Sequence, residues 1–569
     1  MHSIIARTLG LACAKAFAKA VPEAIALATA ATLLAGCATT PSEPVKVKVL
    51  AINDFHGNLK PSSGGIRIKD PADPSKTITV AAGGAEHLAT AVAQLKAQNR
   101  NHIFVAAGDL IGGTPLLSAL FNDEPTIEAL GLMGLEASAV GNHEFDRGAA
   151  ELQRLQTGGC HPKDGCKGPQ PFKGAQFRYL AASTIDTATG KTLLPAFYVK
   201  YFQGIPVAFI GLTLKGTPHI VVPAGVAGLR FDDEAEAVNR VVPELRKQGV
   251  EAIVVLIHEG SFQTGDVNEC VGISGALLDI LGKLDKAVDV VISGHTHRAY
   301  NCRIDGRLVT SAHQYGTVVS DIDLVLDPKT RDVTSAVANN VIVRTASFAK
   351  EPRLTALIDQ YEKLVVPLAR RVVGRTTAAL PRDFAPNGES VLGQVIADAQ
   401  LAATRDAGAQ VAFMNPGGIR AALPLPPDGQ VRYEDLFSIQ PFSNNLVTMT
   451  LTGAQIVQLL EQQWIGRSGP GGTMLQVSRG FSYSWDAARP VGQRVVPGSV
   501  MLAGQPLRPD ASYRVTVNSF LAGGGDSFTV LKEGKASVTG LMDIDALELH
   551  VKNNPTLAPG ALDRITRVN

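Results

Sequence analysis

Several short apolar runs in the N-terminal half are each followed by histidine, asparagine or aspartate. The most informative junction is residues 141–146, where Gly-Asn-His-Glu-Phe-Asp follows small and apolar residues. Apolar runs of this kind predict buried strands, and α/β folds bind ligands beyond the carboxyl ends of such strands. Runs at residues 45–52, 102–107 and 136–140, with a predicted helix at 85–97, indicate a β-α-β-α-β unit with a polar residue at each strand end.

Two of these junctions carry a pair of side chains with metal-binding chemistry. Asp54 and His56 follow the first run, and His295 and His297 follow a run at residues 288–292. A spacing of two residues on an extended segment places both side chains on one face, so each pair could bind one ion. A solvated aspartate beside a capping histidine is the alternative for the first pair, and a structural histidine for the second.

Other junctions add further candidate ligands. Asp109 follows Gly108 and could bridge two metals, although it could also cap a following helix. Asn142 offers a neutral oxygen, and His143 could donate a proton or hold an anion, although an Asn-His turn is also common at caps and hairpin corners. His258 follows a further apolar run. Because each group follows a buried strand, together they indicate a metal centre rather than a set of caps.

The first 36 residues have the features of an export leader. A basic start precedes a small, apolar run, and Leu-Leu-Ala-Gly-Cys at residues 33–37 resembles the lipobox of bacterial lipoproteins, in which the cysteine is lipidated. We therefore expect a signal peptide over 1–36, lipidation of Cys37 and a tether over 37–44. An ordinary signal peptide cleaved near Ala35, or an incidental cysteine, is the alternative. A membrane-spanning helix would need about 20 apolar residues, more than this run has.

The cysteines suit an oxidising compartment. Outside the leader four remain, and four cysteines allow three pairings. We expect Cys160 to pair with Cys166 across a short turn-rich loop, and Cys270 with Cys302. A zinc site is the alternative, but the cysteines lack the short-spaced pairs that such sites use.

The length and the net charge of the chain restrict the number of domains and the kinds of binding partner. The chain has 569 residues, which predicts two domains besides the leader. Its formal net charge of +1 leaves no basic surface for nucleic acid, so no nucleic-acid partner is expected. Residues 198–212 predict a hairpin that turns at 204–206, and residues 352–371 predict a helix with one buried face that connects the domains.

In chain order, Asp-x-His, Gly-Asp, Gly-Asn-His-Glu, a later histidine and Gly-His-x-His resemble the motifs of the calcineurin-like metallophosphoesterases. The finer match is to the bacterial and ecto-5′-nucleotidase family, which includes periplasmic UDP-sugar hydrolases. The resemblance covers nearly the whole mature chain and implies an α/β protein (α+β overall). It implies a four-layer metallophosphoesterase β-sandwich flanked by helices over 45–345, a linker helix over 346–372, and a C-terminal α/β nucleotide-binding domain over 373–569.

The resemblance also implies two divalent metal ions, drawn from manganese, zinc, cobalt or magnesium. The first ion would be held by Asp54, His56 and His297, the second by Asn142, His258 and His295, and both by Asp109. His143 would stabilise the phosphoryl transition state and Asp146 would orient His143. The chain has His297 where some relatives have glutamine or asparagine, and imidazole suits zinc and its neighbours better than an amide does.

The C-terminal part has the features of a binding domain. Glycines at residues 417–418 let the backbone approach a ligand, and Arg420 offers a planar fork for phosphate, although a tight turn with an exposed arginine is the alternative. Phe442 and Phe520 lie in turn-rich loops and could sandwich a base, although loop phenylalanines often plug a core. The resemblance implies a nucleoside site made by Asn415, Arg420, Phe442, Phe520 and Asp526, with Asp526 on the ribose. Arg382, at an imperfect register, is a further candidate.

These features predict an exported, lipid-anchored hydrolase, periplasmic or at the outer membrane of a Gram-negative bacterium, since Ala38 rather than aspartate follows Cys37. It would hydrolyse 5′-nucleotides to nucleoside and phosphate with metal-activated water, and no protein partner is implied. The alternatives are a UDP-sugar or nucleotide pyrophosphatase, a 2′,3′-cyclic nucleotide phosphodiesterase, a thiosulfohydrolase and a non-catalytic surface binding lipoprotein.

Overall fold

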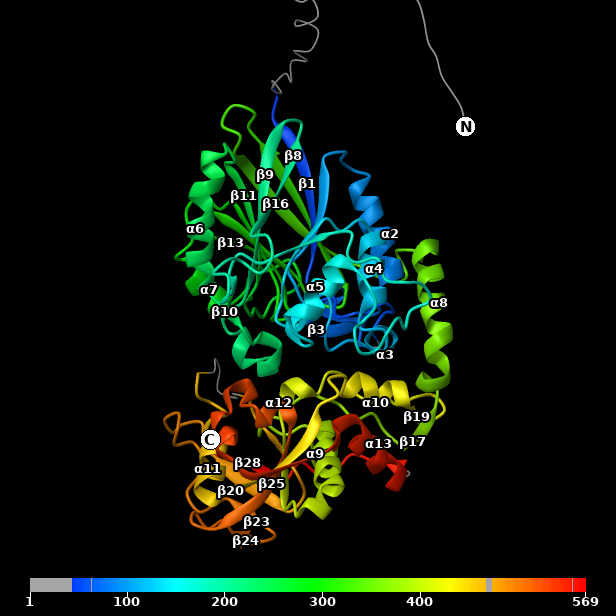
Figure 1. The fold of residues 1–569 in the computed structure, drawn as a ribbon, viewed down its shortest axis with the longest axis vertical. Helices are drawn as coiled ribbons and strands as arrows, with labels where there is room; N and C mark the ends of the chain where they lie inside the picture. The colour runs from blue at the N-terminus through cyan, green and yellow to red at the C-terminus, as the bar shows by residue number, and fades with distance from the viewer. Residues whose placement is uncertain (1–42, 63, 467–472, 555) are drawn as a thin grey trace, which may run out of the picture.

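The computed structural model describes residues 43–62, 64–466, 473–554 and 556–569. They form two parts that are stacked along the long axis of the molecule and connected at one side by α8 (Pro352–Ala369) (Figure 1). Cys37 and the predicted leader lie outside the described residues, so lipidation stays a prediction. Within the described ranges, no helix combines the length and the apolar character needed to cross a membrane.

The N-terminal part contains two six-stranded sheets. The first has the order β16-β15-β1-β4-β5-β6, with β1 (Val45–Ile52), β4 (His102–Ala106), β5 (Ala137–Ala139), β6 (Arg178–Leu180), β15 (Val318–Leu326) and β16 (Val333–Ile342). The second has the order β13-β14-β12-β11-β9-β8, with β8 (Phe197–Phe202), β9 (Ile205–Thr213), β11 (Ala252–His258), β12 (Val290–Ser293), β13 (Ala299–Ile304) and β14 (Arg307–Ala312). The strands that precede the candidate ligands run parallel, so their carboxyl ends lie at one edge of each sheet.

Both faces of each sheet are covered, which explains the continuous apolar runs. In β1, Val47 and Val49 face the second sheet, whereas Leu50 and Ile52 face the helices. The first sheet is covered by α2 (Ala85–Lys96), α4 (Glu124–Leu132) and α5 (Ala149–Thr157), and the second by α6 (Glu234–Lys247) and α7 (Ala276–Leu281). The predicted four-layer sandwich is therefore confirmed.

The hairpin between β8 and β9 forms, but its turn differs from the prediction. The turn is Gln203-Gly204, with φ of 50° and 86°, and Pro206 lies inside β9 opposite Tyr201. Two left-handed residues match the twist of the flanking strands, which favours this turn. Proline is tolerated there because β11 pairs with β9 only from Val207 onward.

Both predicted disulfides, Cys160–Cys166 and Cys270–Cys302, are present. Shorter elements of the N-terminal part are β2 (Ile66–Asp70), β3 (Asp73–Val80), α3 (Leu116–Ala119), β7 (Thr184–Asp186) and β10 (Leu229–Phe231).

The C-terminal part is built on a five-stranded sheet of order β21-β18-β25-β20-β26. Its strands are β18 (Val411–Met414), β20 (Asn445–Thr452), β21 (Gln476–Val477), β25 (Ser512–Asn518) and β26 (Lys535–Met542). Two small sheets add β17 (Val372–Thr376), β19 (Gln430–Arg432) and β27 (Thr556–Leu557), and β22 (Phe481–Trp485), β23 (Met501–Leu502), β24 (Gln505–Pro506) and β28 (Ile565–Arg567). The helices are α9 (Val391–Ala403), α10 (Tyr433–Ile439), α11 (Gly453–Glu461), α12 (Ser519–Ala522) and α13 (Asp543–Asn553).

One apolar cluster joins the two parts. It contains Leu116 and Phe121 from the N-terminal part, Tyr361 from α8, and Leu436 and Ile439 from α10. The rings of Phe121 and Tyr361 meet edge to face, with centroids 4.8 Å apart. This shared core places the loops after β18 and α10 directly against the edge of the N-terminal sheets where the candidate ligands lie.

Candidate functional site

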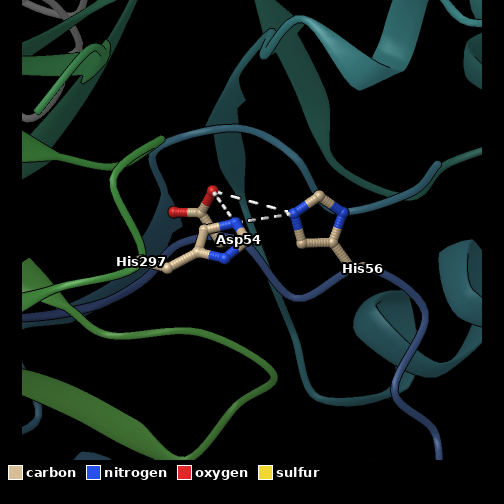
Figure 2. A group of neighbouring side chains, drawn as sticks. All are labelled: Asp54, His56 and His297. Atoms are coloured by element: carbon tan, nitrogen blue, oxygen red, sulfur yellow. Dashed lines mark hydrogen bonds and ion pairs between the residues drawn. The ribbon is translucent and has the colours of Figure 1, made fainter. Parts of the chain in front are cut away.

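Asp54, His56 and His297 form the first group of candidate ligands (Figure 2). The Nε2 atoms of His56 and His297 are 3.1 Å apart, and Asp54 Oδ1 lies 3.3 Å from His297 Nε2 and 3.8 Å from His56 Nε2. The segments are not extended as the sequence argument assumed, because all three residues have left-handed backbones. The side chains converge because the loops curl inward after β1 and β12.

Asp109, His258 and His295 form the second group, with ligand atoms within 4.8 Å of one another. Asn142 joins it, since its Oδ1 lies 3.1 Å from His258 Nε2. Asp109 Oδ2 lies 3.0 Å from His258 Nε2 and 3.6 Å from His56 Nε2. The seven residues selected from the sequence therefore lie together, with Asp109 between the two groups.

Backbone carbonyls fix the orientation of two of these imidazoles. His56 Nδ1 donates to Gly112 O at 2.8 Å, and His258 Nδ1 donates to Ala107 O at 2.8 Å. A carbonyl can only accept, so each Nδ1 carries a proton, which leaves Nε2 as the ring nitrogen that can bind a metal.

The charges of the buried groups fit cation binding. Burial would lower the pKa of His258, but the carboxylate of Asp109 raises it to about 10. Burial would raise the pKa of Asp54, but His297 lowers it to about 2. Burial and the neighbouring His258 lower the pKa of His295 to about 4. Two buried carboxylates thus attract positive charge, and imidazole, carboxylate and amide donors are a ligand set that suits divalent metals.

His143 lies beside the two groups and is held from two directions. Its Nδ1 donates to Asp146 Oδ2 at 2.7 Å, and its main-chain N–H donates to Asp109 Oδ1 at 2.9 Å. Burial would lower the pKa of His143, but the charges of Asp146 and Asp109 raise it. The ring of Phe442, from the C-terminal part, stacks on His143 with 5.7 Å between centroids and 13° between planes.

Arg420 also reaches the site from the C-terminal part. Its Nη2 lies 3.5 Å from His56 Nε2, and its buried Nε has no hydrogen-bond partner among the described residues. A buried guanidinium N–H without a partner is costly unless a ligand accepts from it. Arg382 does not point at the ligands, because its guanidinium donates to the backbone carbonyls of Ile419 and Arg420.

The other predicted nucleoside ligands are partly brought together. Asn415 Nδ2 donates to Asp526 Oδ2 at 2.8 Å, and Asn415 Oδ1 accepts from Asn518 Nδ2 at 2.9 Å. The Phe520 ring packs over Gly525, where a Cβ atom would lie 2.6 Å from it. Phe442 contacts His143 rather than Phe520 in this arrangement, so the proposed base sandwich between the two phenylalanines stays a prediction.

Glu144 has a role that the sequence analysis missed. Its buried carboxylate accepts from the main-chain N–H groups of Gly141 (2.6 Å), Asp109 (3.0 Å) and Leu110 (2.8 Å). Burial and the charge of Asp109 raise the pKa of Glu144 to about 7. The residue ties together the loops that carry Asp109 and Asn142. Its place inside the 141–146 motif was the only signal in the sequence.

Two cavities flank these groups at the junction of the two parts. One, of about 380 Å³, is lined by His143, Asp146 and Phe442. The other, of about 820 Å³, is lined by Tyr315, Arg382 and Arg420. Gly113 lines both cavities, so a ligand whose phosphate lay at the metal-ligand groups could extend along either side of this residue.

Known proteins share both parts of the chain. Residues 47–299 match the family model of the calcineurin-like phosphoesterases, and residues 372–533 match that of the 5′-nucleotidase C-terminal domain. The chain is 33% identical over 517 residues to Endonuclease YhcR of Bacillus subtilis, a match that spans 90% of this chain and 40% of that protein. It is 32% identical over 537 residues to Cell wall protein Lmo0130 of Listeria monocytogenes, spanning 89% of this chain and 66% of that protein.

Among solved structures, the fold is similar to that of a 5′-nucleotidase precursor from Thermus thermophilus. The TM-score is 0.76 at 28% sequence identity, and the match covers 92% of this chain and 100% of that one. The chain thus spans 40% and 66% of the length of the two curated relatives, but the whole of this solved structure.

Proposed function

The chain belongs to the calcineurin-like phosphoesterases that carry a 5′-nucleotidase C-terminal domain, a family of metal-dependent phosphoester hydrolases, and we propose that it hydrolyses 5′-nucleotides to nucleoside and phosphate. The observation that carries the proposal is the place of Arg420. Its Nη2 lies 3.5 Å from His56 Nε2, and its buried Nε has no partner among the described residues, so the guanidinium could donate to the phosphate of a nucleotide held by the C-terminal part. Bidentate recognition of phosphate is the typical use of such an arginine.

The site residues divide into two ligand groups in this proposal. One divalent ion would be held by Asp54, His56 and His297, the other by Asn142, His258 and His295, and both by Asp109. When bound, two such ions neutralise the charge of the phosphate and activate water for in-line attack. The ions expected are manganese, zinc, cobalt or magnesium.

The remaining side chains bind and orient the substrate. With Nδ1 held by Asp146, His143 can donate from Nε2 to the phosphoryl oxygen on which charge develops. Phe442 covers His143 and would exclude water from that side. Phe520 would pack against the base, and Asp526, oriented by Asn415, would accept from the ribose hydroxyls.

Location follows from the leader and the disulfides. We expect the protein to be exported and held at a membrane surface through lipidated Cys37, and the two disulfides support an oxidising compartment. The phosphate and nucleoside released there would be available for uptake.

Phosphate release by the purified mature protein tests the proposal. The protein is stripped of metal, refilled with each of the four metals, and assayed on AMP and other 5′-mononucleotides, ADP, UDP-glucose, 2′,3′-cyclic AMP and a plain phosphomonoester. Much faster release from AMP than from the plain ester is expected. Equal rates on all substrates, or reaction of diesters alone, would contradict the nucleotidase assignment.

A second candidate is a nucleotide pyrophosphatase. The cavity of about 820 Å³ beside Arg420 leaves room for a second organic group attached to the phosphate. Product analysis separates the two activities, because a pyrophosphatase releases two phosphorylated products from UDP-glucose, whereas a nucleotidase releases inorganic phosphate.

A further inference from the structure

The turn at Gly112-Gly113 contacts the metal-ligand groups and the C-terminal part at once. Gly112 O accepts from His56 Nδ1 at 2.8 Å. A Cβ atom at Gly112 would lie 2.6 Å from His143 Cβ and 2.7 Å from Asp146 Oδ2, so no side chain fits there. This residue is therefore needed for the shape of the ligand site itself.

Gly113 faces the other way, toward the C-terminal part. A Cβ atom there would lie 3.0 Å from Arg420 Nε and 3.2 Å from Phe442 Cζ. Contacts this short require the neighbours to move by a few tenths of an ångström. The two neighbours are the side chains that reach over His56 and His143: Arg420 Nη2 is 3.5 Å from His56 Nε2, and Phe442 stacks on His143. The guanidinium of Arg420 also lies over the Phe442 ring, 5.7 Å from its centroid.

We infer that Gly113 is a positioning residue for substrate binding, because its missing side chain lets Arg420 approach His56 and lets Phe442 stack on His143. The inference rests on the proposed function. Hydrogen bonds from a guanidinium weaken steeply when donor and acceptor separate or misalign, so a small displacement of Arg420 removes its contact with the phosphate. Phe442 is displaced with Arg420 because their side chains are in contact, and the nucleoside loses its alignment with the phosphate.

Two substitutions of Gly113 distinguish the effect of side-chain size on kcat/KM from the effect of backbone strain. Gly113 has φ of 56°, which alanine adopts poorly and asparagine more readily. Gly113→Ala should lower kcat/KM for AMP roughly 10- to 100-fold, the loss expected for one charge-assisted contact. Gly113→Asn should lower it at least as much, because the longer side chain displaces Arg420 and Phe442 further. A smaller loss in the asparagine variant would show that strain is the cause and would overturn the inference.

Gly204 provides the matched control. It also has a left-handed backbone, with φ of 86°, and no atom lies within 4 Å of the Cβ position. Gly204→Ala thus introduces comparable strain in the β8–β9 turn without a close neighbour, and its kcat/KM should equal that of the wild type. Bound metal, measured by elemental analysis, should be unchanged in all three variants, because the three atoms nearest to a Cβ at Gly113 belong to Arg420 and Phe442 and not to a candidate metal ligand.

A double-mutant cycle tests whether Gly113 acts through Arg420. Gly113→Ala should lower kcat/KM by a smaller factor in an Arg420→Ala background than in the wild type, since coupled residues are non-additive. Fully additive losses would overturn the inference. The proposed function is tested separately by the wild type: if it releases no phosphate from AMP, the nucleotidase assignment fails, whereas activity on AMP with unaffected Gly113 variants refutes only the role of Gly113.

Discussion

Substituting Glu144 by glutamine should separate the metal centre from the rest of the fold. The carboxylate Oε2 accepts from the N–H groups of Gly141 and Asp109, and Oε1 accepts from Leu110. A glutamine oxygen can replace Oε2, but the amide group then faces the N–H of Leu110. One hydrogen bond is lost and a buried donor is left unpaired, which costs about 1–3 kcal/mol of unfolding free energy.

The larger effect is expected on metal binding. Asp109 and Asn142 lie on the two loops that Glu144 holds, so both donors shift when the loops separate. Groups that orient metal ligands typically contribute about 10- to 100-fold in metal affinity or activity. Metal titrations followed by phosphate release should therefore show half-activation at a roughly 10- to 100-fold higher metal concentration, with kcat at saturating metal less affected.

Glu461 supplies a control of the same kind. It is 8% exposed, and its carboxylate accepts from the N–H groups of Arg494 (2.9 Å) and Val495 (2.7 Å) in the C-terminal part. Glu461→Gln should lower thermal stability by a similar amount and leave the metal titration unchanged. If Glu144→Gln binds metal like the wild type, or if Glu461→Gln weakens it equally, the positioning role of Glu144 is refuted.

Three further predictions follow from the same contacts. His143→Ala should retain both metals but lower kcat by about 10²–10³-fold, whereas Asp109→Ala should lose metal and activity, as elemental analysis and phosphate release would show. Burial raises the pKa of Asp543 to about 7, above its unfolded value near 3.9, so the free energy of unfolding falls as pH rises between these values. Asp543→Asn removes this titration. In urea unfolding, the stability of the variant relative to the wild type should therefore be greater at pH 8 than at pH 4. In the loop-closure model, removing the disulfide Cys270–Cys302, which spans 32 residues, lowers the free energy of unfolding by about 4 kcal/mol. Removing Cys160–Cys166, which spans 6 residues, lowers it by about 2 kcal/mol. Equal changes in the urea midpoint would contradict the model.

The sequence predicted those features that depend on strand pattern. Polar groups after buried parallel strands meet at one sheet edge, which is why Asp54, Asp109 and His258 could be placed together from the sequence. Contacts between distant main-chain groups leave no such pattern. The partners of Glu144 include backbone N–H groups 34 and 35 residues away, which any residue type could supply. The stacking of Phe442 on His143 likewise depends on how the two parts pack, which the sequence does not reveal. The hairpin turn lies at Gln203-Gly204, whereas glycine and proline together had predicted it one residue later.

The backbone conformation of the candidate ligand residues explains why sequence spacing alone did not predict how their side chains converge. Asp54, His56, Asp109, His295 and His297 all have φ between 45° and 69°, a conformation that costs about 1 kcal/mol or more for each non-glycine residue. The strain is offset by bonds between the ligand loops themselves: the N–H of Asp54 donates to Gly108 O, that of His56 donates to Asp109 O, and that of His295 donates to the Asp54 carboxylate. Each loop is thus held by its neighbour, and none can relax alone. The extended spacing assumed for Asp54 and His56 selected two residues that the structure does bring together, but their convergence comes from these hydrogen bonds between the loops. The same bonds explain why a positioning residue such as Glu144 should affect both groups of candidate ligands.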